Sequence, residues 1–594
     1  MDQQKKQFAK GKPSGEKKSF GEKKSFDKKP YEKKPYGDRK SYGDKKPYGD
    51  RKPYGGKKDT GERKTFERKS GGENAPFEKK FDGEKRSFER KPFEKKPFEK
   101  KFDGEKRSFE KKSFGDKSFD KKPYGDRRHS NKKDGDKPAF KKQETLSARD
   151  VALKALVRVS RENAFAAQAL DRELNAVKLS DEDRRLTASL FYHTLENRLR
   201  IENLIAARVK SMPEPQVQDI LCLAAAQILF MDKIPDHAAV DEAVKQTRKT
   251  GKESMTKLVN GLLRGLIRAR DAGELNLPDR DAEPEKYISE KYSVALPLVK
   301  RLTAAYGIDQ AEEIAAWKPD RRSDTIRPNR MRMSDAAFEA WLNEKGFSWE
   351  RAIVPGAYRV SGAGRLASHE GYRDGTFSIQ GESSMLAACA VGAKPGMQVL
   401  DACAAPGGKS CLMAEMMRGV GRVFAWDVHE HRVELIRAAA KRLELENIRP
   451  QVRDAGKKVD SMLESMDAVL VDAPCSGLGV MGDKPDIKYR LTEDTIDALV
   501  PIQKQILETC ASYVCPGGLL VYSTCTILPE ENEKQIRAFL KAHPEFEPDL
   551  SDKWLPESIR CRYQDGMIQI LPCRDHLEGF FIARLRRKAV SYGG

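Results

Sequence analysis

The sequence has 594 residues, a length that predicts three or four domains, and Lys and Arg exceed Asp and Glu by 21. The charge is uneven, because residues 1–140 hold 46 Lys and Arg against 26 Asp and Glu, a net charge of +20, and the other 454 residues have a net charge of +1. No segment has the roughly 18 to 20 consecutive apolar residues of a membrane span, and the lysine-rich N-terminus lacks the apolar stretch of a secretory signal, so we expect a soluble, cytoplasmic protein.

Residues 1–142 form a low-complexity repeat of basic and aromatic residues. Before Leu146 the chain contains no Leu, Ile, Val, Cys or Trp, and we expect a disordered head because little apolar surface offsets the entropy of ordering. Units such as Lys34-Pro35-Tyr36 and Lys96-Pro97-Phe98 place rings beside basic residues. Since rings stack on unpaired bases and basic residues meet phosphates, the repeat predicts non-specific RNA binding, with a solubilising tail as the alternative.

Residues 143–285 have the apolar spacing of amphipathic helices. Leu153, Leu156 and Val157 share one face, and a second stripe consists of Leu258, Val259, Leu262, Leu263, Leu266 and Ile267. Residues 220–230 are nearly all apolar, but a run of about 11 residues favours the central helix of a bundle over a membrane span. This region is therefore predicted to be an all-helical domain.

Residues 286–375 are predicted to form a small α+β RNA-binding subdomain and linker, with a helix over residues 334–345. A cluster of arginines precedes that helix: Arg321, Arg322, Arg327, Arg330 and Arg332. The charge pattern leaves open whether these side chains contact an RNA backbone or only cover a solvated surface.

Residues 376–590 alternate short β-rich apolar runs with segments long enough for crossover helices. The runs are residues 397–400, 423–427, 450–453, 467–471 and 519–522. This alternation is typical of an α/β domain with a Rossmann-like, doubly wound, mostly parallel sheet. Ligands of such sheets bind beyond the carboxyl ends of the strands, near the switch in strand order.

The strand ends of this domain carry the residues expected to bind a nucleoside cofactor. The first strand ends at Asp401 and continues into a loop of small residues: Cys403, Ala404, Ala405, Pro406, Gly407, Gly408 and Lys409. This loop is neither a phosphate-binding P-loop nor a dinucleotide glycine motif, which disfavours ATP and NAD. Asp427 is predicted to end the second strand, where a carboxylate can accept both ribose hydroxyls, and Asp454 is predicted to end the third, where it can contact an adenine edge.

The sequence has ten cysteines, all after residue 142 and without a Cys-x-x-Cys pair, so we expect free thiols and neither disulfides nor a metal site. Cys475, in Asp472-Ala473-Pro474-Cys475, follows the fourth strand, and Cys525, in Thr524-Cys525, follows the fifth. These positions place both thiols beside the predicted cofactor. Other cysteines are interpreted as packing residues: Cys222, Cys389, Cys510 and Cys515.

These motifs closely resemble those of the Sun (Fmu) family of S-adenosylmethionine-dependent RNA cytosine-C5 methyltransferases. The resemblance rests on the loop from Cys403 to Lys409, on the motifs ending at Cys475 and Cys525, and on residues 529–532 (Pro-Glu-Glu-Asn). Ile234-Pro235 and residues 259–264 are similar to the NusB-like RNA-binding domain of the bacterial ribosomal RNA members. Ala402 and Ser410 depart from the more usual Leu and Thr, but neither change removes a functional group.

The resemblance implies a class I methyltransferase domain with S-adenosyl-L-methionine as cofactor and a cytosine of small-subunit (16S) ribosomal RNA as substrate. It implies that Cys525 adds to carbon 6 of the base, that Cys475 assists release, and that Asp472 contacts the base near nitrogen 3. Cofactor binding is assigned to the loop from Cys403 to Lys409, to Asp427, to Asp454 and to Asp472. We further expect an unstacked target cytosine, a lowered pKa of Cys525 and a monomer.

Several alternatives are weighed against this interpretation. A DNA cytosine-C5 methyltransferase would take its nucleophile from the Pro-Cys motif, and the Thr524-Cys525 pair argues against it. An amino-group methyltransferase would need an Asn/Asp-Pro-Pro-aromatic turn in place of residues 472–475. A catalytically idle RNA-binding ribosome-assembly factor, or a methyltransferase of another RNA such as tRNA, stays open.

Overall fold

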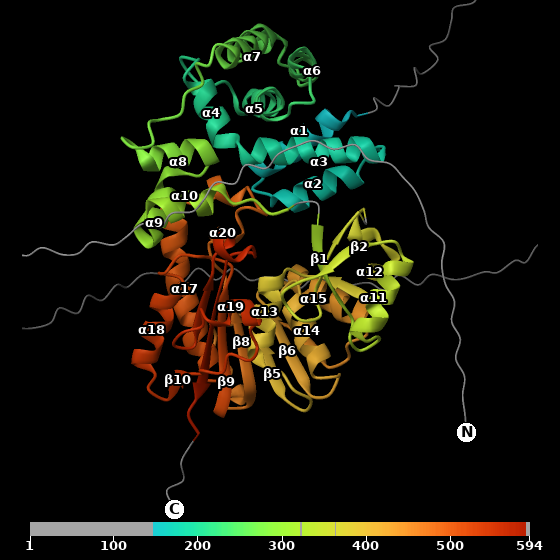
Figure 1. The fold of residues 1–594 in the computed structure, drawn as a ribbon, viewed down its shortest axis with the longest axis vertical. Coiled ribbons are helices and arrows are strands. Elements are labelled where there is room, and N and C mark those ends of the chain that lie inside the picture. The colour runs from blue at the N-terminus through green and yellow to red at the C-terminus, as the bar shows by residue number, and fades with distance from the viewer. Residues whose placement is uncertain (1–145, 321–322, 363, 590–594) are drawn as a thin grey trace, which may run out of the picture. The chain divides into compact units, whose positions relative to one another are not determined.

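The computed structural model describes residues 146–320, 323–362 and 364–589 (Figure 1). The predicted basic head, Arg321 and Arg322 lie outside these residues. Within the described part, no helix is both long and apolar enough to cross a bilayer. The described elements comprise an N-terminal helical region, a three-helix segment, a four-stranded sheet and an eight-stranded sheet.

The N-terminal region is helical, as predicted, and packs around one apolar helix. Its helices are α1 (Ala148–Arg161), α2 (Ala166–Asn175), α3 (Asp181–Glu196), α4 (Arg198–Ala206), α5 (Pro215–Phe230), α6 (Asp236–Lys249) and α7 (Thr256–Asp271). α1 begins at a capping box in which the side chains of Ser147 and Asp150 each accept a hydrogen bond from the other's backbone N–H. Seven consecutive residues of α5, from Ile220 to Ala226, are at most 1% exposed, so α5 is the central helix. Leu258 is 37% exposed, which makes the buried stripe of α7 narrower than predicted.

The helices α8 (Pro284–Tyr292), α9 (Leu296–Tyr306) and α10 (Ile308–Ala316) share a core with the C-terminal half of the chain. Their buried residues pack with Leu478, Ile527 and Leu528, which lie in loops after strands of the large sheet. The sequence indicated a small subdomain and linker here. Apolar spacing within a helix does not reveal a packing partner some two hundred residues away.

The smaller sheet is antiparallel, with strand order β2-β3-β1-β4. The strands are β1 (Ser323–Pro328), β2 (Ser348–Arg351), β3 (Tyr358–Ser361) and β4 (Phe377–Ile379), accompanied by α11 (Asp335–Glu344) and α12 (Glu370–Arg373). α11 lies within the predicted helix. β4 pairs with β1, so this sheet extends beyond residue 375, where the small subdomain was expected to end.

The three described arginines of the basic cluster are all paired with carboxylates of the protein. Arg327 is 3% exposed and donates to Glu415 at 2.6 Å. Arg330 and Arg332 form ion pairs with Asp335 and Glu444. The expectation that Arg327 belongs to a surface, solvated or RNA-binding, is therefore wrong, because its side chain joins the small sheet to a helix of the large one.

The larger sheet is doubly wound, with strand order β10-β12-β9-β8-β5-β6-β7 and β11 paired to β12 (Figure 1). Its strands are β5 (Gln398–Asp401), β6 (Arg422–Asp427), β7 (Ile448–Val452), β8 (Met466–Asp472), β9 (Val514–Thr524), β10 (Phe546–Pro548), β11 (Met567–Ile570) and β12 (Phe580–Arg587). β5 to β9 run parallel and each overlaps one of the five predicted runs, whereas β12 is antiparallel to β9. The predicted α/β fold is confirmed; the antiparallel strands at its edge were not predicted.

Helices cover both faces of this sheet. One face packs with α13 (Glu382–Val391), α14 (Gly408–Met416) and α15 (Glu430–Leu443), and the other with α17 (Glu493–Ala511) and α18 (Glu533–Ala542). Neighbouring strand residues alternate between the two cores: Val399 lies in the first and Leu400 in the second. Short helices complete the domain: α16 (Ile487–Arg490), α19 (Glu557–Arg560) and α20 (Pro572–Asp575).

Candidate functional site

The candidate site lies at the carboxyl ends of the parallel strands, where the strand order reverses. The chain passes from β5 outward to β6 and β7 and then returns to place β8 on the other side of β5. Asp401 ends β5 and Asp472 ends β8, so these two carboxylates flank the switch point at which doubly wound sheets bind ligands.

The two predicted thiols meet at this edge of the sheet. Cys525 directly follows β9, Cys475 lies in the loop after β8, and their sulfur atoms are 3.4 Å apart. Both side chains are partly buried. Two thiols at this distance can contact the same atom of a substrate and can exchange a proton with each other.

The thiol pair is electrostatically unequal. A hydrogen bond from Cys475 lowers the pKa of Cys525, burial opposes this effect, and the cations Lys484 and Lys409 add to the lowering. The same hydrogen bond and burial raise the pKa of Cys475. Cys525 is therefore the thiol that ionises first. The lowered pKa agrees with the sequence-based expectation, but it arises from Cys475 and Lys484, whose contributions were not foreseen.

We expect Lys484→Met to shift the pH profile of Cys525 alkylation upward. Alkylation requires the thiolate, so its rate falls as the pH drops through the pKa of Cys525, and losing the cation raises that pKa. The rate of iodoacetamide labelling of the Cys525 peptide, followed by mass spectrometry across pH, measures the shift. Lys504→Met, which removes an exposed lysine paired with Glu508 on α17, is the matched control and should leave the profile unchanged. An unshifted profile in Lys484→Met would contradict the electrostatic assignment.

Asp472 is held by two donors. Ser523 donates to its Oδ1 at 2.7 Å, and the Lys409 ammonium lies 2.8 Å from its Oδ2. Burial alone would lower the pKa of Lys409, but Asp472, together with Asp401 and Cys525, outweighs burial and raises it, so Lys409 stays protonated. Lys409, predicted only as part of the cofactor loop, thus connects that loop to the carboxylate assigned to the base.

The loop of small residues after β5 packs closely against neighbouring backbone. The Ala404 N–H donates to the Trp426 carbonyl at the end of β6, and the Gly407 N–H donates to the Ala404 carbonyl. Gly407 has φ +105°, a conformation that L side chains rarely adopt, and a Cβ there would lie 3.2 Å from the Cα of Ile436. The peptide bond between Ala405 and Pro406 is cis, and α14 begins at Gly408.

Asp427 ends β6 as predicted, whereas Asp454 lies two residues beyond the end of β7, and the two carboxylates differ in environment. Asp427 is 4% exposed; one oxygen accepts from the His429 N–H and the other lies 3.0 Å from Arg432. Asp454 accepts from the Gly456 N–H in a turn and pairs with Lys457, and its side chain is 44% exposed. Each Asp427 oxygen keeps a further lone pair for a ligand hydroxyl.

Asp401 lies beneath the loop and was predicted only as a strand end. Ser410 donates to its Oδ2 at 2.6 Å, and its buried Oδ1 has no hydrogen-bond partner among the described residues. Burial raises the pKa of Asp401 to about 7, although the Ser410 hydrogen bond acts in the opposite direction. The orphan oxygen of Asp401 and the open acceptor sites of Asp427 fit a ligand with several hydrogen-bond donors. The amine and ribose hydroxyls of S-adenosylmethionine are such donors.

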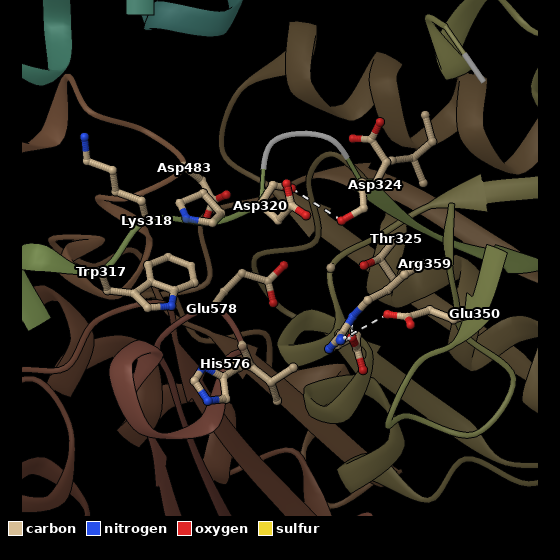
Figure 2. A pocket seen from close by; sticks show the side chains of 16 residues that line it. Trp317, Lys318, Asp320, Asp324, Thr325, Glu350, Arg359, Asp483, His576 and Glu578 are labelled. Atoms are coloured by element: carbon tan, nitrogen blue, oxygen red, sulfur yellow. Dashed lines mark hydrogen bonds and ion pairs between the residues drawn. The ribbon is translucent and has the colours of Figure 1, made fainter. Parts of the chain in front are cut away.

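A separate cavity of about 520 Å³ lies between the four-stranded sheet and residues 576–578 (Figure 2). None of the predicted site residues belongs to its described lining. That lining carries more carboxylates than cations: Asp320, Asp324, Glu350, Glu382, Asp483 and Glu578 against Lys318 and Arg359. Arg359 is paired with Glu382 and Glu350. Because none of the thiols and carboxylates at the strand ends belongs to the described lining, this cavity is not the candidate site.

Comparisons with known proteins match both halves of the described chain. A family model described as "16S rRNA methyltransferase RsmB/F" matches residues 388–586, and a NusB family model matches residues 146–268. A Bacillus subtilis protein named "Probable ribosomal RNA small subunit methyltransferase B" is 38% identical, covering 74% of this chain and 99% of that protein. An Escherichia coli protein named "Ribosomal RNA small subunit methyltransferase B" is 30% identical, and the match covers 75% of this chain and 100% of that protein. A solved structure described as "Crystal Structure of PH0851" is 26% identical and covers 75% of this chain and 100% of its own, with a TM-score of 0.64.

Proposed function

Because this chain belongs to the family of ribosomal RNA small subunit methyltransferases B, which use S-adenosylmethionine, we propose that it methylates carbon 5 of a cytosine in 16S ribosomal RNA. The observation that carries this proposal is the contact between Cys525 and Cys475 at the strand ends beside Asp472. Methylation of a base nitrogen or a ribose oxygen needs no such thiol pair. Carbon 5 of cytosine is a poor nucleophile, and a thiolate that adds to carbon 6 makes it reactive.

In the proposed reaction the Cys525 thiolate forms a bond to carbon 6 of the base. Its lowered pKa supports this assignment, because the thiolate is the nucleophilic form. Asp472 contacts nitrogen 3, and the Lys409 ammonium next to it gives up a proton that passes through the Asp472 carboxylate to nitrogen 3, which leaves Lys409 neutral and makes carbon 6 more electrophilic. S-adenosylmethionine supplies, when bound, the electrophilic methyl group that carbon 5 takes up.

Release of the methylated RNA requires a base that removes the proton from carbon 5 while the bond between carbon 6 and Cys525 breaks. Cys475 assists this elimination, and its contact with Cys525 supports that role. The cofactor is held by the loop from Cys403 to Lys409, with Asp427 at the ribose, Asp454 at the adenine edge and Asp472 beside the methionine part. The target cytosine is unstacked before reaction, since a base within a duplex does not expose its face.

Bisulfite sequencing of total RNA tests this function. Cells that lack the gene should lose the signal of one 16S cytosine, and the wild-type gene should restore it whereas a Cys525→Ala gene should not. Cys561→Ala, which changes an exposed cysteine outside the thiol pair, is the matched control and should restore the signal. A signal lost from tRNA instead would reassign the substrate. No change at any cytosine would favour the RNA-binding assembly factor.

Removing residues 1–142 is expected to weaken binding to ribosomal RNA by at least about tenfold at low salt and to flatten its salt dependence. Residues 1–140 carry a net charge of +20 beside a near-neutral remainder, so most counterion release upon binding comes from this head. Binding isotherms of the full chain and the shortened chain across salt concentrations measure both effects. Equal affinities and equal slopes would refute the role of the head.

A further inference from the structure

We propose that Glu531 is a positioning residue that holds the loops of Cys475 and Cys525 together, so that both thiols reach one base. This inference rests on the proposed function, because it concerns how the two thiols cooperate. Glu531 is 0% exposed, and none of its described hydrogen bonds goes to either sulfur. The sequence singled it out only as part of the motif at residues 529–532.

The Glu531 carboxylate accepts hydrogen bonds from both loops. From the Cys475 loop, Ser476 donates its N–H to Oε2 at 2.9 Å and its hydroxyl to Oε1 at 2.5 Å. From the Cys525 loop, the Thr526 hydroxyl lies 3.1 Å from Oε1 and 2.7 Å from the Ser476 hydroxyl. Each donor directly follows one of the two cysteines. The carboxylate therefore ties together the two backbone segments that carry the thiols.

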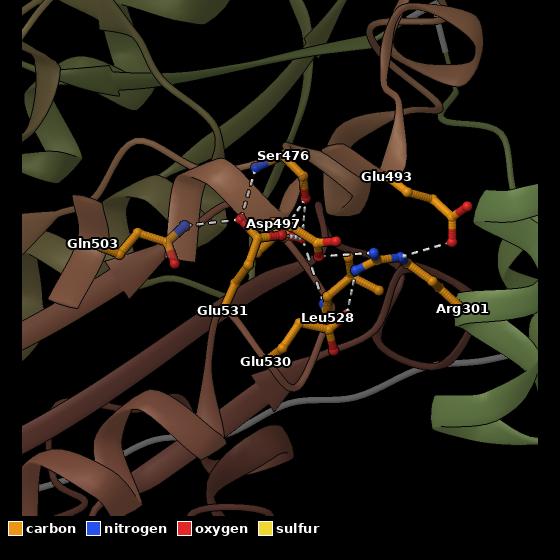
Figure 3. Close-up of polar contacts among 9 residues, drawn as sticks. Arg301, Ser476, Glu493, Asp497, Gln503, Leu528, Glu530 and Glu531 are labelled. Atoms are coloured by element: carbon orange, nitrogen blue, oxygen red, sulfur yellow. Dashed lines mark hydrogen bonds and ion pairs between the residues drawn. The ribbon is translucent and has the colours of Figure 1, made fainter. Parts of the chain in front are cut away.

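A third group locks the carboxylate in place. Gln503, on α17, donates its amide N–H to Oε2 at 2.9 Å (Figure 3). The same nitrogen lies 3.0 Å from the carbonyl of Pro474, which precedes Cys475. Tyr522, in β9, donates to the backbone carbonyl of Glu531 at 2.7 Å. The hydrogen bonds described for the Glu531 carboxylate all come from neutral donors, so its orientation depends on all of them.

The neighbouring glutamate provides a contrast. Glu530 lies 3.0 Å from Arg301 of α9, which also pairs with Asp497 and Glu493 (Figure 3). None of these groups contacts residues 474–476 or residue 526 through a described hydrogen bond. Glu530→Gln therefore removes the same charge one residue away without cutting the connection between the thiol loops.

Loss of this connection should slow the reaction without weakening binding. A displacement of about 1 Å at a reacting group can cost about a hundredfold in rate. Glu531→Gln removes the negative charge that strengthens these hydrogen bonds. Its NH₂ group either faces the Ser476 N–H and the Gln503 amide or forces the Ser476 and Thr526 hydroxyls to turn, so the connection between the two loops weakens. In single turnover, the covalent RNA adduct should form about 10- to 100-fold more slowly than in the wild type. The dissociation constant for the cofactor should stay unchanged.

Phenylarsine oxide tests the distance between the thiols without RNA. One molecule bridges two adjacent thiols by forming two As–S bonds and releasing water. The full-length wild type and Glu530→Gln should be bridged at Cys475 and Cys525, as peptide mass spectrometry would detect, and Glu531→Gln should be bridged at least about tenfold more slowly. Ser476→Ala, which removes one hydroxyl and keeps the N–H, should show a smaller effect and serves as the test if Glu531→Gln fails to fold.

Wild-type bridging in both Glu531→Gln and Ser476→Ala would overturn the proposal. This result is distinguishable from failure of the proposed function, because the arsenical reports the thiol geometry even if no cytosine is methylated. A variant that loses thermal stability yet keeps fast bridging would make Glu531 a purely structural residue and would equally overturn the proposal.

Discussion

Replacement of Cys525 by alanine is expected to reduce methyl transfer to ribosomal RNA by at least about a thousandfold. Without the thiolate, carbon 6 gains no electron pair and carbon 5 stays unreactive, so the whole nucleophilic contribution is lost. Affinity for RNA should persist, because the predicted basic head and the helical domain are unchanged. Transfer of a labelled methyl group to 16S RNA and a parallel binding measurement check both statements.

Cys561→Ala controls for the general effect of removing a thiol, because Cys561 is exposed and directly follows α19. It should retain wild-type activity. If the activity of Cys525→Ala stayed within about tenfold of the wild type, Cys525 would not be the nucleophile.

Replacement of Cys475 by alanine is expected to trap the enzyme on its RNA. The adduct through Cys525 still forms, but its elimination loses the neighbouring thiol, so turnover should fall by at least about a hundredfold while a covalent complex accumulates. Denaturing gel electrophoresis with labelled RNA detects the complex. Since Cys475 also lowers the pKa of Cys525, adduct formation should need a higher pH in this variant than in the wild type.

The double variant Cys475→Ala/Cys525→Ala separates this trap from non-specific crosslinking and should form no complex. If Cys475→Ala instead turned over normally with no complex, release would depend on another group, and the contact between the sulfurs would have no role in the reaction.

The parts of the fold that local patterns determine were predictable from the sequence. Runs of β-branched residues between amphipathic segments predicted the five parallel strands, and parallel strands bring their carboxyl ends to one edge. That rule was sufficient to expect Cys475, Cys525 and Asp472 near one another before any distance was known. The α5 helix was predictable because an apolar run of about 11 residues is too short for a membrane span and favours the central helix of a bundle.

Features that depend on pairs of distant residues were not predictable. The burial of Arg327 depends on Glu415, and nothing near either residue in the sequence identifies the other. Lys484 lowers the pKa of Cys525, but it lies in a loop that carries no recognisable motif. The motif containing Glu531 was visible, but its function as a connection required the positions of Ser476 and Thr526.

The core that α8–α10 share with the loops after β8 and β9 determines where the catalytic half can be separated from the rest. A truncated chain that begins at residue 376 would leave Leu478, Ile527 and Leu528 uncovered, and these residues flank the segments that carry both thiols. It would also lose the hydrogen bond from Tyr306 to the Ile527 carbonyl, two residues after Cys525. The smallest active fragment should therefore begin near Pro284, well before the sheet on which the chemistry takes place.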